Sequence, residues 1–110
     1  MTQSKILFIG WLATAMLGRS ALAEDTVELR AAGGTFDPLQ LVVPAGTPFK
    51  VKVTNGEKIP VEFESFELHR ERVIQPGESI TVNMPPLAAG SYKFFDDFND
   101  KTPQGEIVVK

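Results

Sequence analysis

The chain has 110 residues, with 14 acidic residues against 11 basic ones, a single histidine and no cysteine. This length accommodates one small domain. The lack of cysteine excludes a disulfide framework, a cysteine nucleophile, an iron–sulfur cluster and cysteine-ligated copper or zinc. The acidic balance makes nucleic acid an unsuitable partner, because both would carry negative charge.

The first 23 residues have the composition of a secretory signal peptide. Met1–Lys5 carries one positive charge, Ile6–Leu17 is almost unbroken apolar sequence, and Arg19–Ala23 ends in an A-x-A cleavage pattern. The apolar run of about a dozen residues is shorter than the roughly 20 that cross a bilayer, so a retained membrane anchor is the weaker reading. We therefore expect a periplasmic mature chain that begins at Glu24 and is not inserted in the membrane.

The spacing of turn signals in residues 24–110 is typical of an all-β domain. Removal of the two basic residues of the leader leaves 9 basic against 14 acidic residues, a net charge of −5. Turn signals separate short segments of alternating polarity, and no segment has a convincing helical period. About seven strands packed as a Greek-key sandwich are the economical architecture. The expected strands are Thr26–Ala31, Leu39–Val43, Phe49–Thr54, a segment after Pro60, Arg72–Ile74, a segment from Ile80 to Met84, a segment through Tyr92 and Phe94, and Glu106–Lys110.

The segment VEFESFEL changes its phase in the middle. Val61 and Phe63 alternate inward, with acidic residues outward, but Phe66 and Leu68 continue in the opposite phase. Because one regular strand cannot bury both pairs, we expect a bulge or a break near Ser65.

The residues after this break leave two alternatives open. In a strand, Glu67 and His69 lie two residues apart and share a face, which makes them the best local pair for a metal. Alternatively, Glu67–Arg72 forms a short helical turn. In both cases Arg72–Ile74 is expected to be a strand.

Four stretches in this order resemble a known family: FDPLQLVVPAGTPFKVKVTN, VEFESFEL, VIQPGESITVNMPPLAAGSYKFFDDF and GEIVV. The order is similar to that of cupredoxins, in particular the cupredoxin-like domains of bacterial periplasmic iron uptake systems, from about Thr26 to Lys110. The resemblance implies a cupredoxin-like domain over residues 24–110 that binds copper or iron. It also implies a membrane iron permease, or another periplasmic subunit, as the partner, and at most a ferroxidase-type role within that complex.

The resemblance further indicates where a metal would bind. In electron-transferring cupredoxins, the loop before the last strand supplies a cysteine, a histidine and usually a methionine to one copper. Asp96 falls at the position of that cysteine, and neither Asn99 nor Pro103-Gln104 restores the other ligands. A type 1 blue copper centre is therefore excluded, because it requires a copper–thiolate bond.

A set of hard ligands remains near these positions. Asp96 and Asp97 lie in the loop, and Glu62, Glu67 and His69 come from the region that faces the loop in this fold, with Glu64 as a further candidate. Carboxylates with one imidazole suit iron, manganese or copper(II) better than copper(I).

Each candidate also has a structural explanation. The two aspartates can hold a tight loop by accepting backbone N–H bonds, and glutamates on an outward strand face are by default solvated. A metal-free interaction module that docks on a membrane transporter or a periplasmic partner therefore remains the alternative function. An independent hydrolase is not expected, since the chain has no G-x-S-x-G motif and no phosphate-binding loop.

Overall fold

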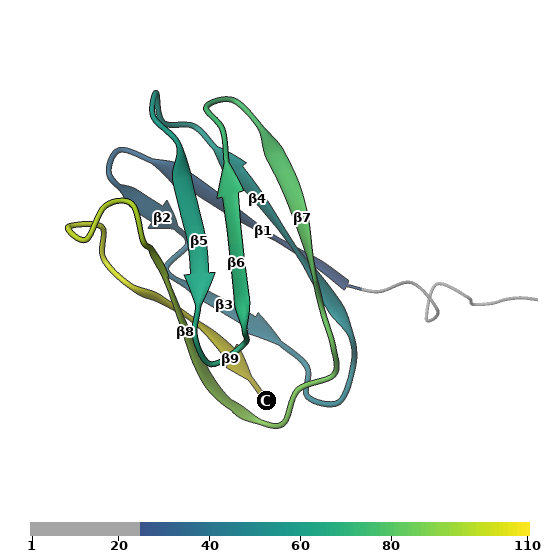
Figure 1. Cartoon of the computed structure of the whole chain (residues 1–110). Coiled ribbons are helices and arrows are strands. Elements are labelled where there is room, and N and C mark those ends of the chain that lie inside the picture. The colour runs from purple at the N-terminus through teal and green to yellow at the C-terminus, as the bar shows by residue number, and fades with distance from the viewer. Residues whose placement is uncertain (1–24) are drawn as a thin grey trace, which may run out of the picture.

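The computed structural model describes residues 25–110, so the predicted leader lies outside the described residues. The described residues form nine strands in two sheets that pack face to face (Figure 1). The all-β sandwich predicted from the sequence is confirmed. The strands are β1 (Asp25–Ala32), β2 (Thr35–Asp37), β3 (Gln40–Val43), β4 (Phe49–Asn55), β5 (Val61–Ser65), β6 (Arg70–Ile74), β7 (Ser79–Met84), β8 (Gly90–Asp96) and β9 (Gly105–Val109).

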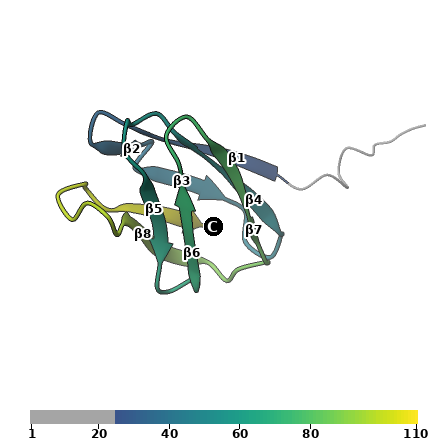
Figure 2. The ribbon, with the colours of Figure 1, turned by 45° about the horizontal axis from the view of Figure 1, so that its top comes forward.

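The two sheets have the strand orders β2-β1-β4-β7 and β3-β9-β8-β5-β6. The β1/β4 and β3/β9 pairs are parallel, and the remaining pairs are antiparallel. Figures 1 and 2 both show β5 beside β6, with the β8–β9 loop extending from one end of the sandwich. The five-stranded sheet therefore brings β5, β6 and the end of β8 together.

Large apolar side chains fill the space between the sheets. Phe36, Phe63 and Phe94 form an aromatic cluster with ring centroids 5.3 to 6.4 Å apart. Phe63 and Phe94 are fully buried and lie on the neighbouring strands β5 and β8. Burial of such rings stabilises the sandwich by roughly 1.5–3 kcal/mol each. This packing fixes which face of β5 and β8 points inward, and so leaves the alternate residues on the outer face.

The sequence pattern did not indicate β2, which has only three residues. Its ladder with β1 pairs Ala31 with Phe36, and Phe36 is buried. One apolar residue gives no readable alternation, so this strand depends on its neighbour rather than on a sequence period.

The predicted break near Ser65 is confirmed, because β5 ends at that residue and β6 begins at Arg70. The expectation that Glu67 and His69 share a strand face is wrong, and so is the alternative of a helical turn over Glu67–Arg72. Both residues lie in the tight turn between β5 and β6, and His69 has a φ of 55°. The turn returns Leu68 to the core, where it is 7% exposed.

Among the described residues, no helix has the length and apolar character needed to cross a membrane.

Candidate metal centre

Asp96 is the last residue of β8 and points into the sandwich. It is 5% exposed, and its Oδ1 accepts the backbone N–H of Glu62 at 2.9 Å and that of Phe98 at 3.0 Å. One carboxylate oxygen therefore ties β5 to the start of the β8–β9 loop. These bonds match the turn-holding role that the sequence left open for this residue.

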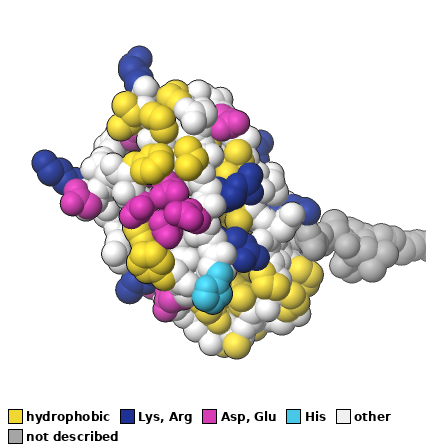
Figure 3. Space-filling model, in the orientation of Figure 1, with side chains coloured by type: hydrophobic (Ala, Val, Ile, Leu, Met, Phe, Trp, Pro, Cys, Tyr) yellow, Lys and Arg dark blue, Asp and Glu magenta, His cyan; other side chains and the backbone are white. Residues whose placement is uncertain are grey.

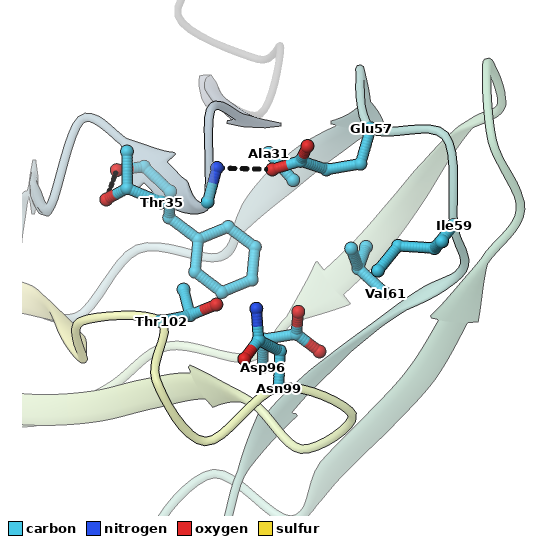
Figure 4. Close-up of a pocket in the computed structure, with 10 residues that line it drawn as sticks. Ala31, Thr35, Glu57, Ile59, Val61, Asp96, Asn99 and Thr102 are labelled. Carbon is cyan, nitrogen blue, oxygen red and sulfur yellow. Dashed lines mark hydrogen bonds between the residues drawn. The ribbon is translucent and has the colours of Figure 1, made fainter.

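A small cavity of about 70 Å³ lies beside Asp96. Asp96, Asn99 and Thr102 line one side of it, and Val61 and Ile59 line another (Figure 4). The polar side chains around the cavity are the carboxylates of Asp96 and Glu57, the amide of Asn99 and the hydroxyls of Thr35 and Thr102, with no thiolate, imidazole or thioether. A type 1 copper ion does not fit these residues, because it needs soft sulfur and imidazole ligands.

A cluster of carboxylates lies on the opposite, outer face of the same strands. Glu62, Glu64 and Asp97 each place a carboxylate oxygen so that these atoms all lie within 4.8 Å of one another. The β5–β8 pairing produces this arrangement, since the Asp97 N–H donates to the Glu62 carbonyl at 3.1 Å and Glu64 pairs with Phe95. We call these three residues the carboxylate cluster. Figure 3 shows acidic side chains gathered on this face of the molecule.

Glu71 adds a fourth negative charge next to the cluster. In the β5–β6 ladder Glu71 is the direct partner of Glu64, so their side chains lie on the same face. Its charge acts on both Glu62 and Glu64, whose pKa values it helps to raise. The face therefore concentrates four acidic side chains on two neighbouring strands and a loop.

Glu62 is the most confined member of the carboxylate cluster. Only 6% of it is exposed, although it lies on the outer face of the sheet. Burial, hydrogen bonding to the Asp97 side chain and the negative charge of Glu71 raise the pKa of Glu62 to about 7. Burial and the charges of Glu71 and Asp97 also raise the pKa of Glu64. Among residues 25–110, no backbone N–H, amide or basic side chain donates to the Glu62 carboxylate.

This arrangement is costly for the protein alone and favourable for a cation. Like charges in a poorly solvated site oppose ionisation, whereas a bound cation favours the ionised form of every carboxylate around it. The ligand atoms are all carboxylate oxygens, which are hard donors that suit a divalent cation such as manganese better than they suit copper(I). The geometry can therefore hold a cation, and Glu62 is its least solvated ligand.

The structure brings together two of the five residues that the sequence predicted as metal ligands, Glu62 and Asp97. The other three, among the described residues, lie outside the 4.8 Å group. Asp96 points inward, and the Glu67 Oε1 accepts the backbone N–H of Lys93 at 2.6 Å. His69 lies in the turn and lines a shallow hollow with Glu64 and Glu71.

The sequence contains a signal for two further acidic residues on this face, namely the break at Ser65 that ends one strand. Glu64 was a further candidate, and Glu71 was not considered as a ligand. Once the break at Ser65 is treated as a hairpin turn, the register pairs Ser65 with Arg70 and therefore Glu64 with Glu71.

Comparison with known proteins gives relatives in sequence and in structure. The chain is 40% identical over 74 residues to the uncharacterized protein RP394 of Rickettsia prowazekii (strain Madrid E). The match covers 67% of this chain and 59% of that protein, so it spans less than two thirds of the relative.

Solved structures with the same fold include copper proteins. Auracyanin A, a blue copper protein of Chloroflexus aurantiacus, superposes with a TM-score of 0.67 at 16% identity, over 80% of this chain and 100% of that one. The metal-binding domain of the Cu(I)-exporting P-type ATPase CopA of Streptococcus pneumoniae gives a TM-score of 0.66 at 15% identity, over 77% and 84%. At these identities the likeness establishes the fold alone. The family model of the cupredoxin-like domain matches residues 5–109, and the chain belongs to that family.

Proposed function

We propose that this protein is a periplasmic metal-binding component that holds iron or copper(II) at the carboxylate cluster. We further propose that it serves a membrane iron permease in the uptake or oxidation of ferrous iron. The observation that carries the proposal is Glu62, a carboxylate that is 6% exposed, faces two other carboxylates within 4.8 Å and accepts no hydrogen bond from an N–H group among residues 25–110. In the metal-free protein a proton shared between Glu62 and Asp97 offsets the crowding of like charges, and a cation that replaces this proton would neutralise all three carboxylates at once.

Each residue of this face has a distinct role in the proposal. Glu62 is the inner ligand, and Glu64 and Asp97 close the site from β5 and from the β8–β9 loop. Glu71 lies next to them and adds to the negative field that attracts a cation. A bound iron or copper ion would supply redox chemistry at this position, while the protein residues bind it, release their protons and limit its contact with water.

Two sequence features support the cellular role. The predicted leader supports export to the periplasm, and the resemblance to the cupredoxin-like domains of iron uptake systems supports the permease as partner. Membership in the cupredoxin-like domain family is compatible with this role, because two proteins with the same fold, auracyanin A and the metal-binding domain of CopA, bind copper.

The second candidate function is a metal-free module that docks on a membrane transporter or another periplasmic subunit. The position of Asp96 favours it, since the site of the cupredoxin cysteine is occupied by a carboxylate that holds two backbone N–H groups. Such a site contributes to the fold and not to metal binding.

Calorimetric titration of the mature protein, residues 24–110, with copper(II) and with anaerobic ferrous iron separates the two functions. We expect one saturable site, and we expect Glu62→Gln to weaken it by at least about tenfold, or 1.4 kcal/mol. Glu28→Gln is the matched control, because Glu28 is an exposed glutamate on β1 in the other sheet. Titrations without saturable binding, or equal binding by Glu62→Gln, would reject the metal site and favour the docking module.

A further inference from the structure

A groove lies beside the carboxylate cluster on the outer face of the five-stranded sheet. Its volume of about 460 Å³ lies within the roughly 300–1,000 Å³ that is typical of small-ligand sites. The β5–β6 turn forms one wall, and β8 and the β8–β9 loop form the rest. Six residues line it: Phe66, Glu67, Lys93, Phe95, Asp97 and Gln104.

Two phenylalanines form the apolar part of this groove. Phe66 is 69% exposed, and its ring packs against that of Phe95 with centroids 5.1 Å apart and an interplanar angle of 65°. Both rings lie on the outer face, away from the aromatic core of the sandwich. Figure 3 shows hydrophobic side chains directly beside the acidic patch on this side of the molecule. The groove therefore offers aromatic rings to solvent next to several carboxylates.

Two carboxylates, those of Glu67 and Asp97, line the groove together with these rings. Glu67 is held in place by its bond to the Lys93 N–H, which leaves its second oxygen available to a ligand. Asp97 lines the groove as well as the carboxylate cluster. The Lys93 side chain acts on Glu106, whose pKa it helps to lower after the hydrogen bonds from Ser91 and Gln40. The charge of Lys93 is thus partly balanced by Glu106. The groove beside Phe66 remains acidic, because Glu67 and Asp97 line it against the single Lys93.

We propose that this groove binds an arginine side chain presented by a protein partner. A guanidinium is flat, stacks on aromatic rings and bonds carboxylates through two parallel N–H groups, so it matches rings flanked by acids. A lysine ammonium is a strongly hydrated point charge and gains less from the rings. A second copy of this chain is a poorer occupant, because the mature chain carries a net charge of −5 and copies repel each other.

The inference goes beyond the proposed metal function and is separable from it. Phe66 and Glu67 line the groove but do not belong to the carboxylate cluster, whereas Glu62 and Glu64 belong to the cluster but do not line the groove. Variants can therefore disable one site and leave the other intact.

The test is a titration followed by ¹H–¹⁵N NMR in a metal-free buffer, with the peptides Gly-Arg-Arg-Gly and Gly-Lys-Lys-Gly as probes. We expect saturable shifts at the amides of Phe66, Lys93 and Phe95 with the arginine peptide. We expect binding of the lysine peptide to be at least about threefold weaker, the size of a cation–π preference at an exposed site. Phe66→Ala and Glu67→Gln are each expected to weaken arginine binding at least about threefold.

Two controls make the outcome decisive. Phe98→Ala removes another exposed phenylalanine, 53% exposed, that does not line the groove, so it should leave binding unchanged. Glu62→Gln should weaken metal binding at least about tenfold and leave arginine binding unchanged, because Glu62 does not line the groove. Equal binding of both peptides, shifts spread over the whole acidic surface, or no effect of Phe66→Ala would overturn the proposal. Shifts that depend on protein concentration without peptide would instead identify a second copy as the occupant, and would also overturn it.

Discussion

Asp96 and Asp97 are neighbours in the chain but belong to two different environments. Asp96 points between the sheets, and its Oδ1 accepts two backbone N–H bonds at 2.9 and 3.0 Å. Asp97 points to the outer face, where its carboxylate joins Glu62 and Glu64. The first carboxylate has its partners from the protein, whereas the second is placed among groups of its own charge.

This difference shows that the two faces of one sheet have different functions, because one face stabilises the fold and the other can bind a ligand. A strand sends successive side chains to opposite faces, so one residue step moves a carboxylate from the core side to the outer side. On the core side, a satisfied carboxylate connects β5 to the loop after β8. On the outer side, crowded carboxylates lower the stability of the metal-free fold when they ionise and favour a bound cation, which is the usual conflict between stability and function at a binding site.

The largest effect should come from the core side, by removal of the Asp96 carboxylate. Asp96→Ala leaves two backbone donors without an acceptor, at about 1–3 kcal/mol each, so we expect a loss of about 2–6 kcal/mol in the free energy of unfolding. Urea denaturation measures it. Asp96→Asn is the control, because an amide oxygen can accept the same two bonds. A well-folded Asp96→Ala protein that has lost metal binding would show instead that Asp96 is a ligand.

The next effect concerns the outer side, where a proton and a metal compete for Glu62. Because the pKa of Glu62 is raised to about 7, metal binding below that pH must release a proton. We expect copper(II) affinity to rise by about tenfold per pH unit below pH 7 and to level off above it, as one released proton requires. Titrations in buffers from acid to weakly alkaline pH measure the slope. An affinity that does not change with pH would place the metal elsewhere.

The third prediction concerns the stability of the metal-free protein. The pKa of Glu62 is about 7 in the folded protein and lies above the ordinary value of 4.5. Between these two pH values, the folded protein keeps a proton on Glu62 that the unfolded chain has already lost. This contribution to stability is complete below pH 4.5 and is lost as the pH rises through about 7. Melting temperatures of the metal-free protein should therefore fall over this range. Glu62→Gln, which cannot ionise, should reduce this dependence and melt a few degrees higher than the native protein at pH 8. A native protein that melts at the same temperature at both ends of the range would contradict the prediction.

The smallest effect should come from His69, which the sequence had favoured as a ligand. His69 lies in the β5–β6 turn, outside the group of carboxylates within 4.8 Å. We therefore expect His69→Ala to change metal affinity by less than about twofold, within 0.4 kcal/mol. Calorimetry beside Glu62→Gln checks this. A tenfold loss would move the site toward the turn and restore the sequence-based assignment.

Several features of this protein follow from the sequence by itself. The alternation in Phe49–Thr54 and the turns between short segments determine an all-β sandwich, because period-two polarity requires a strand with one buried face. The phase change at Ser65 determines that a strand ends there. The absence of cysteine determines that no type 1 copper centre forms. These are local or compositional properties, and they need no knowledge of neighbours in space.

The tertiary structure alone decided which acidic residues meet. Glu64 and Glu71 become partners only through the register of the β5–β6 hairpin, and Asp97 joins Glu62 only because β8 pairs with β5. The burial of Glu62 on an outer face also depends on these neighbours, since its own strand would leave it in solvent. Sequence periodicity gives the face of a side chain within its strand, whereas strand register and packing give its partners across strands.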